Sequence, residues 1–433
     1  MHAGAASDAQ IWDQAETLPP PQLQALQLDR LRATVKRILD GQPFAAQRLT
    51  AAGLDAPEQL TSLGDLARLP FTSKADLRAR YPFGLLAVGR DQLVRVHASS
   101  GTHGKPTVVG YTRADLENWT ELMARCMTMA GVRPGMTLHN ANGYGLFTGG
   151  LGFHQGGERI GATVVPVSGG FTARQLLLLH DLGARVLIST PSYALAIAQA
   201  IAEAGVTGLN LELGLLGGEP WTEAMREQIE RALGITAVNF YGLSEMCGPG
   251  VAAECPARAG LHVQEDHFAV EVIDAGGRPA APGAEGELVF TTLTKEAMPL
   301  LRYRTGDIGR LVTGTCGCGR TMARVTGLRG RLDDMLIVRG VNIYPSQVER
   351  VLLSDGGAAP HYRLIVERPG PLDELTLECE PADAAGDPAL LRARLERLLR
   401  ENLGLRINVT VAKPGEIPRS EGKAARVLDR RPG

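Results

Sequence analysis

The sequence has few of the features that mark membrane, secreted or nucleic-acid-binding proteins. Its formal net charge is only −2 over 433 residues, which gives no general attraction to nucleic acid or anionic lipid. No uninterrupted apolar stretch approaches the roughly 20 residues that a transmembrane helix needs. Residues 1–20 contain acids and lack a basic segment followed by an apolar run, so they do not resemble a signal peptide. We therefore expect a cytoplasmic protein with no nucleic-acid or membrane partner.

Cysteine and aromatic residues are also scarce. Six cysteines in a chain of this length do not make a disulfide framework, so a reducing compartment is the simplest expectation. Aromatic residues make up only 5% of the chain, which makes a local Tyr and Phe cluster noticeable. The apolar fraction of 44% and the charged fraction of 21% are those of an ordinary globular protein with a large core.

The length and the apolar patterns predict two domains of unequal size. Between residues 94 and 233, short apolar runs alternate with amphipathic stretches, which predicts α/β layers with largely parallel strands. Residues 268–330 combine β-rich runs with Gly and Pro turns, which predicts a smaller β subdomain. The remainder resembles a compact α+β unit, so we expect domains at 1–332 and 333–433. The expected helices are 116–130, 194–204, 223–233, 345–353 and 390–403, and the expected strands are 94–97, 107–111, 162–167, 185–189, 214–216, 269–273, 286–292, 335–338 and 363–366.

A glycine-rich loop, SSGTHGKP at residues 99–106, follows a short apolar run. Its two glycines let the backbone approach a polyanion, its hydroxyls donate hydrogen bonds, and Lys105 supplies positive charge. A solvated hairpin turn is the simpler alternative. Pro106 stands where the Walker motif needs Ser or Thr for magnesium, which disfavours a P-loop NTPase. The loop fits a different chemistry with ATP.

Four further short motifs follow this loop along the chain. They are YGLSE at 241–245, YRTGD at 303–307, GRLDD at 330–334 and EGK at 421–423. One of these motifs alone would be weak evidence. All five, in this order over about 330 residues, resemble those of the acyl-adenylate-forming enzymes, which include acyl-CoA synthetases, adenylation domains of peptide synthetases and luciferases. The resemblance implies a large N-terminal domain of layered α/β sheets and a small, mobile C-terminal domain.

Within that superfamily the chain most closely resembles the phenylacetate–CoA ligases. The segments that carry this resemblance are YGLFTGGLG at 144–152, EPWT at 219–222, DDMLI at 333–337, GVNIYPSQ at 340–347 and IPRSEGK at 417–423. The chain departs from the usual pattern at His103, at Gly218, and in the FHQGG sequence that follows Gly152. The last two departures lie around the expected acyl pocket. The resemblance therefore implies adenylation of an aryl or arylacetic acid, with the particular acid left open.

The resemblance also implies a role for individual residues. The phosphate loop would comprise Ser99, Ser100, Gly101, Thr102, Gly104 and Lys105. The adenine and ribose side would comprise Gly218, Glu219, Pro220, Tyr241, Gly242, Ser244, Asp307 and Arg331. The acyl pocket would comprise Tyr144, Gly145, Phe147, Gly149, Phe153, His154 and Gly217. Lys105, Glu245 and Lys423 would be catalytic, Asp333 the hinge between domains, and Gly340 part of the thiol channel.

The chemistry explains why these residue types are needed. A carboxylate attacks the α-phosphorus of ATP and pyrophosphate leaves, so the site must screen several negative charges. Magnesium needs a hard carboxylate, for which Glu245 is the candidate; a first-turn helix acid after a Ser244 cap is the alternative. Asp307 would accept both ribose hydroxyls, although Asp after Gly is also common in turns. Tyr241 would stack on adenine or pack in the core. The Lys423 ammonium would stabilise the transition state, whereas a lysine near a terminus is usually a solvated charge.

A small group of cysteines and histidines suggests a structural metal site. Three thiolates with one imidazole are a common ligand set for structural zinc. The candidate ligands are Cys255, His262, Cys316 and Cys318, with Cys247 and His267 as substitutes. The alternative is a set of reduced cysteines without a metal, which an exposed Cys-Gly-Cys turn makes less attractive.

The sequence as a whole predicts a ligase that uses ATP, Mg²⁺ and coenzyme A. The runner-up has the same first half-reaction but passes a substituted benzoate to the phosphopantetheine thiol of an acyl carrier protein. A nucleotide-binding regulator without turnover is a third alternative, which the full set of charged motif residues disfavours. A homodimer is expected from the resemblance alone.

Overall fold

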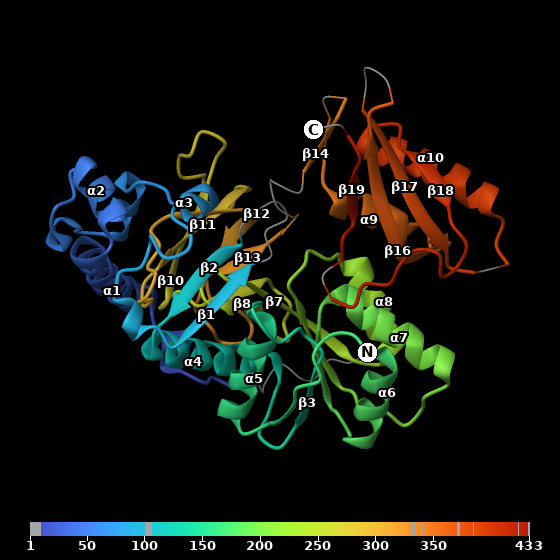
Figure 1. Ribbon diagram of the computed structural model, residues 1–433, viewed down its shortest axis with the longest axis horizontal. Helices are drawn as coiled ribbons and strands as arrows, with labels where there is room; N and C mark the ends of the chain where they lie inside the picture. Colours follow the sequence, from blue (N-terminus) through green and yellow to red (C-terminus); the bar gives the residue numbers. More distant parts are fainter. Residues whose placement is uncertain are drawn as a thin grey trace.

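The computed structural model describes residues 10–99, 106–328, 330, 335–339, 341–369, 373–383, 385–422 and 424–431. These residues form a large N-terminal domain and a smaller C-terminal domain (Figure 1). The helices are α1 (Pro20–Gly41), α2 (Pro43–Ala51), α3 (Lys74–Ala79), α4 (Arg113–Ala130), α5 (Gly149–Ile160), α6 (Thr172–Asp181), α7 (Pro191–Ala204), α8 (Glu223–Leu233), α9 (Pro345–Ser354) and α10 (Pro388–Leu403), with short 3₁₀ turns at Gln14–Thr17, Pro57–Gln59, Leu63–Arg68 and Arg90–Gln92.

The strands of the large domain are β1 (Arg95–Ser99), β2 (Thr107–Tyr111), β3 (Thr137–Asn140), β4 (Thr163–Val165), β5 (Val186–Ser189), β6 (Leu213–Gly217), β7 (Thr236–Leu243), β8 (Gly248–Glu254), β9 (Leu261–Val263), β10 (Phe268–Ile273), β11 (Gly286–Thr292), β12 (Tyr303–Val312) and β13 (Arg324–Thr326). Those that follow are β14 (Leu336–Val338), β15 (Val341–Ile343), β16 (Ala358–Glu367), β17 (Glu374–Pro381), β18 (Asn408–Val411) and β19 (Val427–Asp429).

The N-terminal domain contains one large sheet and a separate two-stranded antiparallel sheet, β1–β2. Over the described residues the large sheet has eleven strands in the order β10-β11-β12-β13-β9-β8-β7-β6-β5-β3-β4. The strands from β4 to β7 are parallel, as expected, and every pairing beyond β7 is antiparallel. Residues 268–330, expected as a β subdomain, are β-rich as expected, and their strands form the antiparallel end of this sheet.

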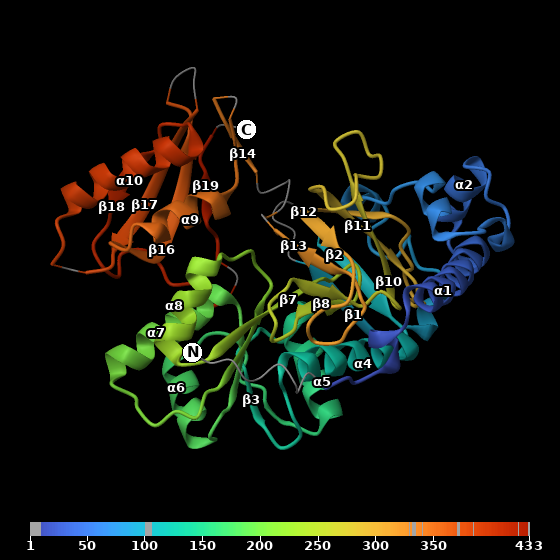
Figure 2. The same ribbon diagram turned by 180° about the vertical axis from the view of Figure 1, so that it is seen from behind.

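Helices cover the sheet and continue the βα alternation that the sequence indicated. Helices α4 and α5 pack on each other and on β8, whereas α6, α7 and α8 lie beside the parallel strands (Figures 1 and 2). Their ends have recognisable signals, since Thr112 caps α4, Thr190 caps α7 and Thr222 caps α8 through side-chain acceptance of a backbone N–H. Gly131 and Gly234 end α4 and α8 in the left-handed conformation.

The C-terminal domain is a small α+β unit. Its described strands form a four-stranded sheet in the order β18-β17-β16-β19, packed against α9 and α10. Leu395 and Leu399 of α10 are fully buried in this packing. A hairpin, β14–β15, precedes the sheet, and the domain lies next to α7 and α8 (Figure 1). None of the described helices combines the length and the apolarity needed to cross a bilayer.

Buried ion pairs fasten the N-terminal segment to the large domain. The Nε atom of Arg320 donates to Glu16 Oε2 at 2.5 Å, and both side chains are 1% exposed or less. The backbone N–H of Thr321 donates to the Glu16 carbonyl at 3.1 Å. Arg125 and Asp266 form a second buried pair at 2.7 Å. Segments that are far apart in sequence are thus held by groups that water cannot solvate.

We expect the Glu16–Arg320 pair to be important for stability. The Arg320→Ala variant leaves the Glu16 carboxylate buried without its partner, and its free energy of unfolding should fall by about 3–5 kcal/mol. Arg185→Ala is the matched control, because Arg185 and Glu212 form a solvent-exposed pair, which contributes little to stability. Urea denaturation measures both. Equal losses in the two variants would contradict the expected difference.

Candidate active site

The nucleoside motifs meet where β7 and β12 approach each other. The hydroxyl of Tyr241, near the end of β7, donates to Asp307 Oδ2 in β12 at 2.6 Å. The centroid of the Tyr241 ring also lies 6.0 Å from that of Phe290, so the ring packs on the sheet while its hydroxyl bonds Asp307, the residue expected to bind ribose. The Ile308 N–H donates to the Gly330 carbonyl at 3.1 Å, which joins this strand to the segment before the expected hinge. Tyr241 and Asp307, which are 66 positions apart in sequence, are thus in direct contact.

Glu245 lies in a tight turn, residues 244–247, between β7 and β8. Within this described stretch no helix begins at Ser244, so the alternative of a helix-capping pair does not hold. The Tyr111 hydroxyl donates to the carbonyls of Ser244 and Cys247 at 3.3 and 3.1 Å. Lys295 Nζ donates to the Glu245 carbonyl at 2.8 Å. The backbone of the turn is therefore fixed from behind, and the Glu245 carboxylate has no hydrogen-bond or ion-pair partner among the described residues.

Two glycines allow the strands at the site to approach closely. A Cβ atom at Gly217 would lie 2.2 Å from the Phe240 carbonyl oxygen, and one at Gly242 would lie 2.0 Å from the Gly248 carbonyl oxygen. Gly218, with φ +86°, and Pro220 are exposed at the carboxyl end of β6, beside the end of the parallel strand β7. Ligands of open α/β sheets bind at such carboxyl ends. The positions expected on the adenine side therefore share one edge of the sheet.

A chain of polar groups runs through the expected acyl segment. Asn140 Nδ2 donates to the Tyr144 hydroxyl and to the Gly150 carbonyl, both at 2.8 Å. The Tyr144 hydroxyl lies 3.1 Å from His154 Nδ1, and His154 Nε2 lies 3.1 Å from Glu158 Oε1. Burial raises the pKa of Tyr144 to about 12. The phenol therefore stays protonated, and the hydrogen bond between Tyr144 and His154 fixes the two side chains relative to each other.

The aromatic residues of this segment have different surroundings. Phe153 is buried and its ring centroid lies 5.0 Å from that of Phe240, which is the arrangement expected for core packing. Phe147 is 46% exposed, just before α5. A Cβ atom at Gly149 would lie 2.7 Å from the Phe147 ring, and Gly145 has φ +135°, so small residues are needed at both positions. The roles of these residues in an acyl pocket remain predictions.

Ser99 and Glu219 are the described residues at the two ends of the expected nucleotide site. Ser99 ends β1, directly before the glycine-rich loop, and its buried hydroxyl has no hydrogen-bond partner among the described residues. The Glu219 carboxylate accepts from the backbone N–H groups of Ser192 and Ala424. The site predictions that lie outside the described residues are Ser100, Gly101, Thr102, Gly104, Lys105, Arg331, Asp333, Gly340 and Lys423.

Two described residues of the site escaped the sequence reasoning. Thr190 caps α7 and also donates a hydrogen bond to Gly422 of the C-terminal domain. The Thr-Pro pair after a buried strand was the only sequence feature that could have indicated the cap. Lys295 is buried, and its Nζ lies 5.1 Å from the Tyr111 ring centroid. Burial lowers the pKa of Lys295 to about 8, although the nearby Asp115, Cys247 and Glu245 raise it. A single lysine in a turn carries no sequence signal for such a position.

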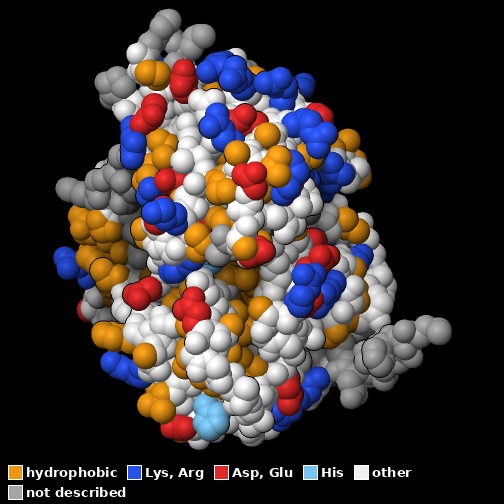
Figure 3. Space-filling model, turned by 90° about the vertical axis from the view of Figure 1, so that its right-hand side faces the viewer, with side chains coloured by type: hydrophobic (Ala, Val, Ile, Leu, Met, Phe, Trp, Pro, Cys, Tyr) orange, Lys and Arg blue, Asp and Glu red, His pale blue; other side chains and the backbone are white. Residues whose placement is uncertain are grey.

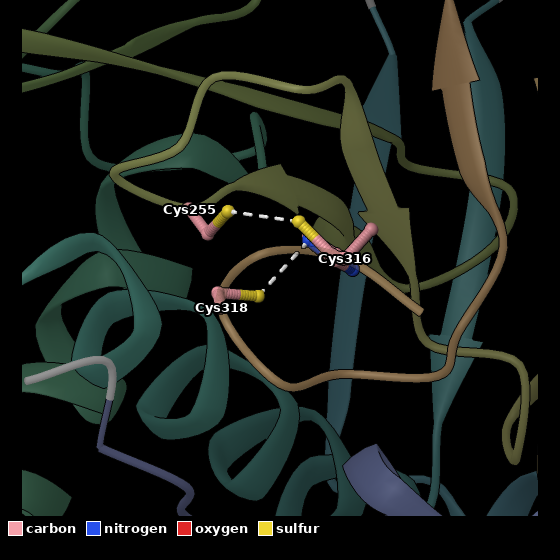
Figure 4. Close-up of side chains that lie close together, drawn as sticks. Cys255, Cys316 and Cys318 are labelled. Carbon is pink, nitrogen blue, oxygen red and sulfur yellow. Dashed lines mark hydrogen bonds between the residues drawn. The ribbon is translucent and has the colours of Figure 1, made fainter. Parts of the chain in front are cut away.

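The four expected metal ligands come together in space (Figure 4). Their ligand atoms all lie within 4.8 Å of one another, with Cys255 and Cys316 sulfurs 3.8 Å apart and Cys318 Sγ 3.5 Å from His262 Nε2. Zn–S bonds of about 2.3 Å in a tetrahedron separate two sulfurs by about 3.8 Å, so the observed spacing fits zinc. The substitutes Cys247 and His267 are not part of this group among the described residues.

A large α/β domain followed by a small α+β domain, with the nucleoside motifs on one sheet edge, defines an adenylate-forming enzyme. The chain belongs to the AMP-binding enzyme family, whose model matches residues 10–293, and the model of the AMP-binding enzyme C-terminal domain matches residues 340–431. It is 51% identical to a phenylacetate-coenzyme A ligase of Thermus thermophilus, over 96% of this chain and 98% of that one. It is 46% identical to an Escherichia coli phenylacetate-coenzyme A ligase, over 97% of both chains. The resemblance found in the sequence is confirmed.

Solved structures agree with this assignment and add information about domain arrangement. A 2-hydroxyisobutyryl-CoA ligase in the postadenylation state matches with a TM-score of 0.90 at 31% identity, covering 96% of this chain and 91% of that one. The same ligase in its thioesterification state matches with a TM-score of 0.72 at 32% identity, covering 96% and 92%. The domains of the present structure are therefore arranged more like the postadenylation state.

The buried Lys295 leads to a prediction about pH. Its pKa of about 8 lies below the ordinary 10.5, so the unfolded chain binds more protons between these values and folding stability should rise with pH there. We expect wild type to gain up to about 3 kcal/mol relative to Lys295→Met across this window. Urea denaturation of both proteins from below pH 8 to near pH 10.5 measures the difference. If the difference in free energy of unfolding between the two proteins did not change with pH, a lowered pKa of Lys295 would be contradicted.

Proposed function

We propose that this protein is an acid–CoA ligase that activates an arylacetic acid with ATP and then transfers the acyl group to coenzyme A. The observation that carries the proposal is the whole-length similarity, at 45–51% identity, to four proteins named phenylacetate-coenzyme A ligase. The described part of the site agrees with this chemistry, because Tyr241 bonds Asp307 and Glu245 lies in the turn directly after β7. The non-catalytic alternative has no comparable support.

In the first half-reaction, the acid's carboxylate attacks the α-phosphorus of ATP, and acyl-AMP and pyrophosphate form. Asp307 would accept hydrogen bonds from the ribose hydroxyls and Tyr241 would hold the nucleoside. Glu245 would hold Mg²⁺, since its carboxylate makes no hydrogen bond or ion pair with a described residue and a hard oxygen ligand suits this ion. When bound, Mg²⁺ supplies positive charge that lowers the repulsion between the phosphates and the acid. Lys105 and Lys423, which lie outside the described residues, would add charge at the phosphates and at the transferring group.

The nature of the acid follows from the relatives rather than from the described pocket. Phenylacetate is our first candidate, because the relatives that match along the full length are named for it. The 2-hydroxyisobutyryl-CoA ligase, by contrast, is 31% identical and is named for a short branched acid. Tyr144 and Phe147 offer aromatic surface that suits a ring. The polar chain from Asn140 to His154 would tolerate a hydroxyl or amino substituent.

In the second half-reaction, the thiol attacks the acyl carbon and AMP leaves. We infer that the C-terminal domain, beginning near Asp333, rotates between the two steps, with Gly340 near the thiol. The two TM-scores support this, since the solved ligase differs between its two states in the way the domains are arranged. Lys and Arg side chains gather over the C-terminal domain, where α10 carries four arginines (Figure 3). This charge suits an anionic thiol such as coenzyme A. A homodimer and a cytoplasmic location remain expectations.

Acid-dependent ATP–pyrophosphate exchange tests the first half-reaction. Purified protein should exchange with phenylacetate, and more weakly or not at all with benzoates, aminobenzoates and 2-hydroxyisobutyrate. Lys423→Ala should slow exchange by about 100-fold or more, because charge stabilisation at the transition state is lost. No exchange with any acid, in folded protein that binds ATP, would overturn the ligase assignment and favour the regulator.

The same protein then separates the two thiol acceptors. Coenzyme A should release AMP from the acyl adenylate at a rate that matches turnover. Transfer only to the phosphopantetheine of an acyl carrier protein would replace the coenzyme A proposal with the alternative acceptor.

We also propose that Cys255, His262, Cys316 and Cys318 hold a structural zinc ion. Three of the four residues are buried. Cys316 and Cys318 lie in a turn, and Arg320, two residues after Cys318, bonds Glu16 of the N-terminal segment. The four residues come from the end of β8, from β9 and from the loop after β12, so the ion would fasten these three segments together.

Metal analysis and a chelator test this site. We expect about one zinc per chain, lost in Cys316→Ser, together with a fall in melting temperature of several degrees. Cys379→Ser is the control, because Cys379 is buried in the C-terminal domain away from the ligands and should leave the zinc content unchanged. Protein that is purified without metal and is indifferent to chelator would exclude this zinc site.

A further inference from the structure

Two side chains of the large domain hold the backbone on either side of position 423. The Thr190 hydroxyl donates to the Gly422 carbonyl at 2.9 Å. The Ala424 N–H donates to Glu219 Oε2 at 2.8 Å. Thr190 precedes α7 and Glu219 follows β6, whereas Gly422 and Ala424 belong to the C-terminal domain. The two bonds therefore cross between the domains at the residue expected to be catalytic.

The receiving side of this contact is fixed within the large domain. Glu219 Oε1 accepts from the Ser192 N–H at 2.7 Å, which leaves Oε2 to meet Ala424. Thr190 Oγ1 accepts from the Tyr193 N–H at 3.3 Å while its proton points to Gly422. Both groups thus sit at the N-terminus of the 14-residue helix α7, whose dipole favours a carboxylate there. One half of the contact is preorganised whether or not the C-terminal domain is docked.

A close steric contact accompanies these hydrogen bonds. A Cβ atom at Gly169 would lie 2.8 Å from the Glu421 carbonyl oxygen, and one at Gly170 would lie 2.9 Å from Glu421 Oε2. Gln175 Nε2 donates to the Gly170 carbonyl at 2.8 Å and the Tyr193 hydroxyl donates to it at 3.0 Å, so this glycine loop is itself held in place. Docking of Glu421 therefore depends on the missing side chain at position 169, where the contact is with backbone, whereas at position 170 the Glu421 side chain could move aside.

We propose that Thr190 and Glu219 form a backbone clamp that holds Gly422 and Ala424 during the adenylation step and releases them for thioester formation. The inference rests on the proposed function and assigns to Glu219 a role other than contact with adenine. A bond from N–H to a carboxylate is stronger than one between neutral groups, so Glu219 supplies most of the hold. The clamp is closed in a structure arranged like the postadenylation state of the solved ligase.

The clamp carries little net cost when it opens, because each group keeps a partner. Glu219 retains its bond to Ser192 and Thr190 retains its bond to Tyr193, while water can replace Ala424 and Gly422. A third contact between the domains, from Arg426 to the Ser192 hydroxyl at 3.3 Å, lies at the same helix end. Docking and release can therefore alternate without disturbing the large domain.

Measuring the two half-reactions separately tests the clamp. Adenylation is followed by single-turnover formation of acyl-AMP, and thioester formation by adding coenzyme A to enzyme loaded with synthetic acyl-AMP. Thr190→Val removes the hydroxyl, Glu219→Gln places an amide NH₂ against one N–H, and Gly169→Ala obstructs docking. We expect each variant to slow adenylation by about tenfold or more relative to thioester formation. Thr190→Ser, which keeps the hydroxyl, should restore the wild-type ratio.

Glu212→Gln is the matched control, since Glu212 is exposed, pairs with Arg185 and is remote from the clamp. Equal slowing of both half-reactions in all three variants, with lower melting temperatures, would show a merely structural role and overturn the clamp. An unchanged ratio in variants that fold normally would also overturn it. Wild-type protein that fails to adenylate any acid refutes the proposed function instead, so the two failures are distinct.

Discussion

At Gly217 and Gly242 the backbones of neighbouring strands come too close for any side chain, since a Cβ atom there would lie 2.2 Å or less from a carbonyl oxygen. This close approach places the ends of β6 and β7 side by side and sharpens the turn to β8 that carries Glu245. Tyr111 and Lys295 then hold the turn through its carbonyls. The other parts of the site take their positions from this edge, because Tyr241 on β7 meets Asp307 and Glu219 after β6 meets the C-terminal domain. The close backbone contacts at these two glycines therefore set the positions of the charged groups of the site.

Much of the fold could be predicted from local patterns. The strands 107–111 and 286–292 and the helix 223–233 have the expected bounds, because turn residues or a Thr cap mark their ends. Strand β16 is longer than the expected 363–366, since its first residues pair irregularly with β17 and carry no clear apolar alternation. The union of residues 268–330 with the large sheet was missed for a different reason. Strand order depends on pairings such as β13 with β9, about which local periodicity says nothing.

The site could be predicted as far as its motifs extend. Tyr241 and Asp307 were assigned to the same nucleoside, and they are in contact. The four expected metal ligands were chosen by residue type, and their ligand atoms lie within 4.8 Å of one another. Thr190 and Lys295 were missed because each acts on a backbone group that is distant in sequence, and the residue that is bonded can be of any type. Such contacts leave no pattern in one sequence, whereas reactive side chains do.

The clamp has a kinetic consequence of its own. A grip that forms before one reaction and must break before the next cannot be improved without limit. A firmer hold on residues 422 and 424 would favour transfer of the adenylyl group from ATP to the acid and delay departure of the domain, whereas a weaker hold would do the reverse. Turnover should therefore pass through a maximum at intermediate grip, as in the volcano-shaped relation between surface binding and rate in heterogeneous catalysis. The Glu219 carboxylate keeps Ser192 as a permanent partner and Ala424 as a temporary one, which gives a hold of intermediate strength and so favours a turnover rate near this maximum.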